Sequence, residues 1–168
     1  MVETGLFMLV GATMIAAAAY DVLTLTIPNW ISVVLVALFP LLALAAGISW
    51  PEFGWHVAIG MIALAAGVAA FAVGVVGGGD AKLFAAIAFY MGPLAIANYV
   101  LAVAVAGGVL ATLFLILHQP RLEEWTRKTP VIANIVSRGL AIPYGVAIVA
   151  GGLIAAPSSH LVSLIALA

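Results

Sequence analysis

The sequence has no cysteine among its 168 residues. This absence excludes disulfide bonds, a thiolate nucleophile and a cysteine-ligated zinc site. The H-E-x-x-H pattern of zinc peptidases and the G-x-S-x-G pattern of serine hydrolases are absent as well. Any catalytic chemistry must come from other side chains, and we expect neither a metal site nor a cofactor.

Charged residues are also scarce. They make up 7% of the chain while hydrophobic residues make up 67%, and soluble domains carry roughly 25% charged residues. A water-soluble fold could not bury so much apolar surface, so we expect an all-α polytopic protein with the lipid bilayer as its solvent. Five basic residues and a net charge of -1 at pH 7 give no reason to expect a nucleic-acid partner.

Hydropathy, glycine and proline divide the chain into about six expected membrane helices. They cover residues 4–20, 30–47, 55–76, 81–91, 94–117 and 140–156. The fourth would span only ~17 Å at 1.5 Å per residue, which predicts a short or partial helix that ends at Gly92-Pro93. The tail from Pro157 to Ala168 is apolar but too short to cross, and we expect an interfacial stub or an extension of the sixth helix. No domain boundary is visible, which predicts a single membrane-embedded domain over residues 1–168.

The basic residues give this arrangement an orientation. Lys82 flanks the third connection, and the other four basic residues lie in the connection 118–139: Arg121, Arg127, Lys128 and Arg138. The positive-inside rule makes that side cytoplasmic, which predicts an inner-membrane protein with both termini outside. The only two aspartates, Asp21 and Asp80, then lie at the cytoplasmic ends of the first and fourth helices.

These two aspartates are the main candidates for catalysis. An acidic side chain costs ~2.5 to 3.5 kcal/mol at a helix centre and less near the ends, so its presence invites a functional explanation. Two carboxyl groups a few Å apart share a proton, which lets one activate water and the other protonate a scissile carbonyl. The alternatives are a solvated interfacial Asp21 and an Asp80 that caps the fourth helix or pairs with Lys82.

Three glycines precede Asp80, at 77–79. Without side chains they allow strained backbone conformations and let a substrate backbone approach closely. The alternative is that Gly74 and Gly78 form a small-residue pair for helix packing.

Three segments carry a resemblance to a known family. The run G-G-G-D-A-K-L at 77–83 resembles the GxGD signature of type IV prepilin peptidases. Asp21 followed by I-P-N at 27–29 resembles the first catalytic region of that family, and I-P-Y-G at 142–145 resembles its P-[FY]-G element. The resemblance implies that Asp21 and Asp80 are the catalytic pair. It also implies that further residues bind substrate or shape the site: Gly77, Gly78, Gly79, Lys82, Pro28, Asn29, Pro143, Tyr144 and Gly145.

The function that this resemblance implies is an aspartic endopeptidase that cuts the leader from prepilin-like precursors at the cytoplasmic membrane face. The expected partners are the lipid bilayer and the precursor, which carries a basic leader followed by an apolar helix. No oligomeric state is predicted. Larger bacterial members carry an extra region with paired cysteines that is associated with N-methylation. Here residues 21–30 form a short turn and cysteine is absent, so we expect cleavage without methylation. This compact form resembles the peptidases of Flp-type tight-adherence pili, and archaeal preflagellin peptidases share it.

Two other functions are compatible with a strongly hydrophobic chain of this size. The carboxylates could relay protons in a small transporter, although a relay requires acids spread through the membrane depth. The chain could also be a non-catalytic scaffold.

The remaining polar and aromatic residues have simpler expected roles. His56 and His118 are expected at the interfaces, and Glu52 and His160 in solvent. The tryptophans near helix ends are expected to anchor the chain in the interface. The connection 118–139 is expected to be an interfacial amphipathic stretch, with docking of the substrate leader as the alternative.

Overall fold

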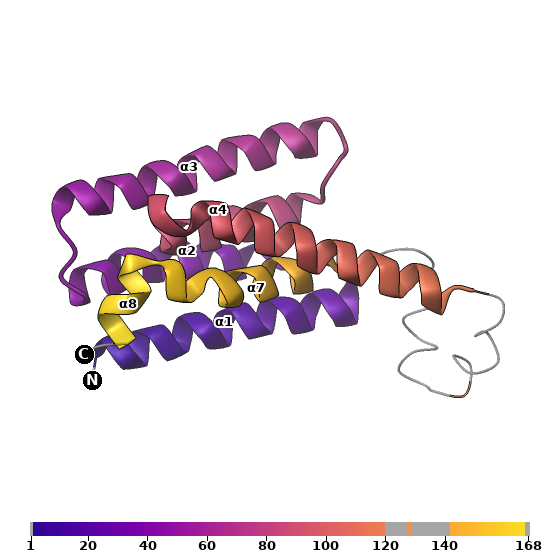
Figure 1. Ribbon diagram of the computed structural model, residues 1–168, viewed down its shortest axis with the longest axis horizontal. Helices are drawn as coiled ribbons and strands as arrows, with labels where there is room; N and C mark the ends of the chain where they lie inside the picture. Colours follow the sequence, from indigo (N-terminus) through magenta and orange to yellow (C-terminus); the bar gives the residue numbers. More distant parts are fainter. Residues whose placement is uncertain (1, 120–127, 129–141, 167–168) are drawn as a thin grey trace.

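A computed structural model describes residues 2–119, 128 and 142–166. Within these ranges the chain is helical and forms no strand, which confirms the all-α fold class (Figure 1). The elements are α1 (Val2–Thr24), α2 (Asn29–Ala45), α3 (Trp50–Ala72), α4 (Gly78–Leu117), α7 (Tyr144–Ala155), the 3-10 turn η2 (Ala156–Ser158) and α8 (His160–Ala166).

Three of these helices, α1, α3 and α4, are long and apolar enough to cross a membrane, and α2 and the α7 region are shorter apolar helices. The chain runs back and forth along one bundle axis, and α8 lies beside the start of α1 at one end of that bundle (Figure 1). We call the end that holds the last turn of α1 and the first turn of α4 the aspartate end. The other is the opposite end.

The first half of α4 is the centre of the bundle. Every residue from Ala85 to Gly92 is buried, whereas membrane helices at the periphery expose one face to lipid. A helix that is apolar all round is expected in a core. This explains why a segment too short to span the bilayer alone is stable here: it packs against neighbouring helices on every side.

The helix α4 is two helices joined at a kink. Gly92 has φ 61° and ψ -171°, and Pro93 follows it. Because proline has no N–H, the Phe89 carbonyl loses its usual helical donor. The predicted break between the fourth and fifth segments therefore lies at the residues expected, within one continuous element.

Side chains from elsewhere satisfy the carbonyls at this kink. Nδ1 of His56 lies 2.7 Å from the Phe89 oxygen and donates to it, and the Ser159 hydroxyl donates to the Tyr90 oxygen at 2.6 Å. His56 is only 2% exposed. The side chain of His56 is thus buried within the bundle, because the carbonyl freed by Pro93 needs a buried donor.

The helix α3 begins and ends earlier than the predicted range 55–76. It begins at Trp50 because Ser49 caps it, accepting from the Glu52 N–H at 3.4 Å, and proline is tolerated in a first turn. It ends at Ala72 because Gly74, at φ 75°, turns the chain and donates to the Phe71 oxygen at 2.9 Å.

The C-terminal tail folds back onto the bundle at the opposite end. Leu161 and Ile165 of α8 are buried among the core residues, and α8 contacts α4. His160 is exposed, as expected, but it is not without a partner: its Nδ1 pairs with Oε1 of Glu52 at 2.6 Å, and Glu52 is partly buried. The tail adds apolar contacts to the core and ties it to the start of α3.

Candidate active site

Asp21 lies in the last turn of α1 and is 4% exposed. Its Oδ2 accepts a hydrogen bond of 2.6 Å from the N–H of Gly145, in the first turn of α7. The first N–H groups of a helix have no partner within it, so they readily bind an acidic group. The first turn of α7 therefore holds one oxygen of this buried carboxyl group.

Only glycine fits at this position of α7. A methyl group at residue 145 would lie 2.8 Å from Oδ2 of Asp21 and 2.9 Å from Cδ1 of Ile27. Pro143, two residues earlier, is the N-cap of α7 and is buried. The P-Y-G element thus begins a helix and brings a backbone N–H to Asp21.

Asp80 is the third residue of α4, and Gly77 is the N-cap. The Gly77 N–H donates to the Asp80 carboxylate, which is one half of a capping box. The predicted alternative of Asp80 as the N-cap is therefore wrong by three positions, although Asp80 does bind the cap's backbone. Its carboxyl group is half-buried.

The alternative of an ion pair between Lys82 and Asp80 is not what the described residues show. Nζ of Lys82 donates instead to Oδ1 of Asn29 at 2.8 Å, at the start of α2. Pro28 is the N-cap of α2. The second and fourth helices are thus joined near the aspartates, at a contact separate from the two carboxyl groups.

One residue, Ile27, lies beside both the glycine that binds Asp21 and the glycine that precedes Asp80. Its Cδ1 approaches Gly145, which binds Asp21, and its Cβ lies 3.2 Å from where a side chain on Gly79 would begin. The carboxyl groups of Asp21 and Asp80 are close enough to repel each other. Ile27 therefore packs the connection after α1 against the start of α4.

The turn that brings Ile27 there depends on Leu25, which has a positive φ of 53°. This region is unfavourable for a residue with a side chain. The Leu25 N–H donates to the backbone carbonyl oxygen of Asp21 at 2.8 Å, and α1 ends at Thr24, three residues after Asp21. The sequence showed Ile27 only as part of a motif and gave no sign of Leu25, because neither role is visible without the packing.

The glycines at 77–79 let neighbouring side chains lie close to the backbone. None has a positive φ, so the expectation of strained backbone there is wrong; positive φ falls on Gly74. A side chain on Gly77 would approach Asp80 to 2.8 Å, and one on Gly78 would meet the Phe71 ring. A side chain added at Gly74 would have nothing within 4 Å, so the alternative of a packing pair made by Gly74 and Gly78 is also wrong.

A cavity of about 290 Å³ lies beside Asp80, between α3, α4 and α7. Small residues of α3 line one side of it, and Tyr144 and Ile148 of α7 line another. The Tyr144 hydroxyl occupies the space that a side chain at Gly107 would need. Asp80 is the one charged group in this otherwise apolar lining.

The structure thus brings Asp21, Gly145, Tyr144, Asp80 and the glycine run to one end of the bundle, with Lys82, Asn29 and Pro28 beside them. Among the described residues, no three His, Cys, Asp or Glu side chains gather as metal ligands would. The basic residues Arg121, Arg127 and Arg138 of the connection 118–139 lie outside the described residues.

The sequence profile of the Type IV leader peptidase family matches residues 8–112, more than half of the chain. The matched range includes Asp21, the I-P-N segment and the glycine run with Asp80, whereas the P-Y-G element follows it. Comparison with curated proteins and with solved structures found no match.

Proposed function

The chain belongs to the type IV leader peptidase family, and we propose that it is an aspartic endopeptidase that removes the leader of type IV prepilin-like precursors. The observation that carries this proposal is the convergence of two acidic side chains. Asp21 and Asp80, 59 positions apart in the sequence, interact electrostatically at one end of the bundle, and a backbone N–H donates to each.

Hydrolysis by this pair needs one ionised and one protonated carboxyl group. The ionised group takes a proton from water as its oxygen attacks the scissile carbonyl carbon, and the protonated group donates to the carbonyl oxygen. Collapse of the tetrahedral intermediate breaks the C–N bond. The group that took a proton from water gives it to the leaving amine, and the other carboxylate takes a proton back from a hydroxyl of the intermediate. Water is consumed and both carboxyl groups recover their starting protonation.

The surroundings of the pair suit this mechanism. A backbone donor fixes one oxygen of each carboxyl group, which orients the group toward substrate and water. The cavity beside Asp80 is apolar, and electrostatic interactions are stronger in such surroundings than in water. The exposed Gly77 leaves room for a peptide backbone to approach Asp80.

The position of the pair suits the proposed substrate. A prepilin-like precursor carries a basic leader followed by an apolar helix, so its scissile bond lies near the membrane surface. Tyr20 and Trp30 are exposed beside the site and pack edge to face, with ring centroids 6.3 Å apart. Aromatic residues of this kind gather at membrane interfaces, which supports an interfacial depth and, with the basic residues, the cytoplasmic face.

Two features support cleavage without methylation. Only residues 25–28 separate α1 from α2, which leaves no room for an additional cytoplasmic region there. The paired cysteines that are associated with methylation are absent from the sequence.

Mass spectrometry of the reaction product tests this function. The purified protein in detergent is incubated with a prepilin that carries a basic leader and an apolar helix. We expect one new N-terminus, at the junction between leader and helix, with no added methyl group. An intact precursor after prolonged incubation, or cuts spread along the precursor, would contradict the proposal.

A further inference from the structure

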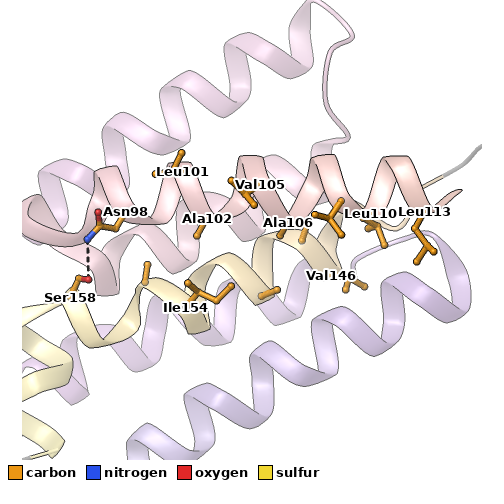
Figure 2. Close-up of a pocket in the computed structure, with 14 residues that line it drawn as sticks. Asn98, Leu101, Ala102, Val105, Ala106, Leu110, Leu113, Val146, Ile154 and Ser158 are labelled. Carbon is orange, nitrogen blue, oxygen red and sulfur yellow. Dashed lines mark hydrogen bonds between the residues drawn. The ribbon is translucent and has the colours of Figure 1, made fainter. Parts of the chain in front are cut away.

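A long groove runs along the surface where the second half of α4 and α7 lie side by side (Figure 2). Its volume is about 710 Å³, and no charged residue lines it. Most of the lining side chains belong to Ala, Val, Leu or Ile. In a chain that spans the membrane, this is an apolar groove open to the lipid on one side.

The groove is long enough to hold a helix, and alanines line its base. From Asn98 to Leu113 its lining residues recur every three or four positions along α4, which covers ~22 Å at 1.5 Å per residue. Ala102 and Ala106 lie on the side of α4 that faces α7, and Leu101 and Val105 lie farther from α7 (Figure 2). Alanine at these positions allows a neighbouring helix backbone to approach closely.

The two ends of the groove differ. At the opposite end of the bundle, the side-chain amide of Asn98 donates to the Ser158 hydroxyl at 3.0 Å, which joins the two walls (Figure 2). At the aspartate end the lining includes Val146, next to Gly145, whose N–H binds Asp21. The aspartate end of the groove therefore lies next to the residue that binds Asp21.

We infer that this groove receives the apolar helix of the precursor and so brings the junction between leader and helix to Asp21 and Asp80. The inference rests on the proposed function, because it assumes that substrate. An apolar helix matches the uncharged lining, the alanines at the base and the length of the groove. Because Val146 of the groove follows Gly145 in α7, a substrate helix in the groove would have one end beside the residue that binds Asp21.

Photocrosslinking tests the occupant of the groove. The photoreactive residue p-benzoylphenylalanine replaces Val105, which is 58% exposed in the groove, or Ala104, which is exposed on the same helix but does not line it. With a co-expressed prepilin, we expect an adduct to the apolar segment of the prepilin from position 105 and little from position 104. Equal adducts from both positions would overturn the inference, as would an adduct only to lipid or to a second copy of this chain.

Blocking the groove gives an independent test. We expect Ala106→Phe to lower kcat/KM for prepilin cleavage by about tenfold or more, which corresponds to ~1.4 kcal/mol. Ala104→Phe adds the same ring outside the groove and should cleave like wild type. Similar kcat/KM values for the two variants would overturn the inference. Should Ala106→Phe fail to fold, the crosslinking result decides, since Val105 is exposed and its replacement fills no packed space.

The failures of the two proposals are distinguishable. If wild type cleaves the prepilin and Ala106→Phe cleaves it equally well, the groove does not hold the substrate helix and the proposed peptidase function stands. If wild type does not cleave any prepilin, the peptidase proposal itself fails.

Discussion

Asp21 and Gly145 are 124 positions apart in the sequence and joined by a hydrogen bond of 2.6 Å. Each could be identified from its motif, but the bond between them could not. It depends on the first turn of α7 lying against the last turn of α1, and on a glycine that leaves room for the carboxyl group. The same packing places Ile27 against Gly145 and Gly79.

The contact at Gly145 leads to a testable prediction. Gly145→Ala adds a methyl group 2.8 Å from Oδ2 of Asp21, which must displace either the carboxyl group or α7. Because a shift of about 1 Å in a catalytic group can cost about 10²-fold in rate, we expect the initial rate of leader cleavage to fall by at least about tenfold. The matched control is Gly108→Ala, where the added methyl group would have nothing within 4 Å. Equal rates for the two variants would show that the Gly145 contact does not position Asp21.

Individual polar residues were the least predictable part of the molecule. Asp21 and Asp80 could be assigned to one end of the bundle because helices alternate in direction along the chain. The partners of His56, Glu52 and His160 could not be predicted, because they depend on a carbonyl freed at the kink and on a tail that folds back. Such contacts are tertiary and leave no local pattern in the sequence.

At the scale of the helices, the kink at Gly92-Pro93 illustrates what a local pattern can and cannot predict. Proline and glycine mark a break in any helix, so its position was predictable. How the bundle compensates was not, because the donors come from α3 and from the residue before α8. The predicted start of α3 was late by five residues because Pro51 was assigned to a loop, whereas Ser49 caps a helix that includes it.

The donors at the kink give a prediction on stability. Ser159→Ala removes the hydroxyl that donates to the buried backbone carbonyl oxygen of Tyr90. A buried carbonyl without a donor costs ~1 to 3 kcal/mol. We expect a thermal unfolding midpoint in detergent that is lower by several degrees, at about 2–4 °C per kcal/mol. Ser163→Ala is the control, since its hydroxyl bonds an exposed carbonyl of His160. A midpoint for Ser159→Ala no lower than that of Ser163→Ala would contradict this account of the kink.

At the scale of the whole molecule, the fold class and the division into helices followed from composition and hydropathy. Scarce charge and long apolar runs admit few other solutions in a bilayer. The burial of the first half of α4 was only partly predictable, because its short length indicated a partial helix without showing that other helices surround it. The long apolar groove was not predictable, because it is a property of two helices placed together.

The orientation in the membrane is testable because the chain has no cysteine, so a single introduced cysteine is the only thiol. Val75, near the aspartate end, and Trp50, at the opposite end, are each 75% exposed. We expect a membrane-impermeant maleimide to label Trp50→Cys in intact cells. It should label Val75→Cys only in inverted membrane vesicles. The reverse pattern would place the aspartates on the outer face and contradict the proposed orientation.

The depth of the acidic residues separates a peptidase from a proton relay. Within the described residues, Asp21 and Asp80 lie at one end of the bundle, and Glu3 and Glu52 lie near the other. No acidic residue of the described spans lies midway between the two ends, where a relay would need one. This arrangement supports a site at one membrane surface.

The rate of leader cleavage by single asparagine variants tests the central claim most directly. Asparagine keeps the shape of aspartate and removes its ability to exchange a proton, and acid or base catalysis contributes about 10²- to 10⁴-fold. We predict that Asp21→Asn and Asp80→Asn each lose at least about 10²-fold in rate while remaining inserted and folded, and that Glu3→Gln at the opposite end cleaves like wild type. Full cleavage of the prepilin by either asparagine variant would contradict the proposed catalytic pair.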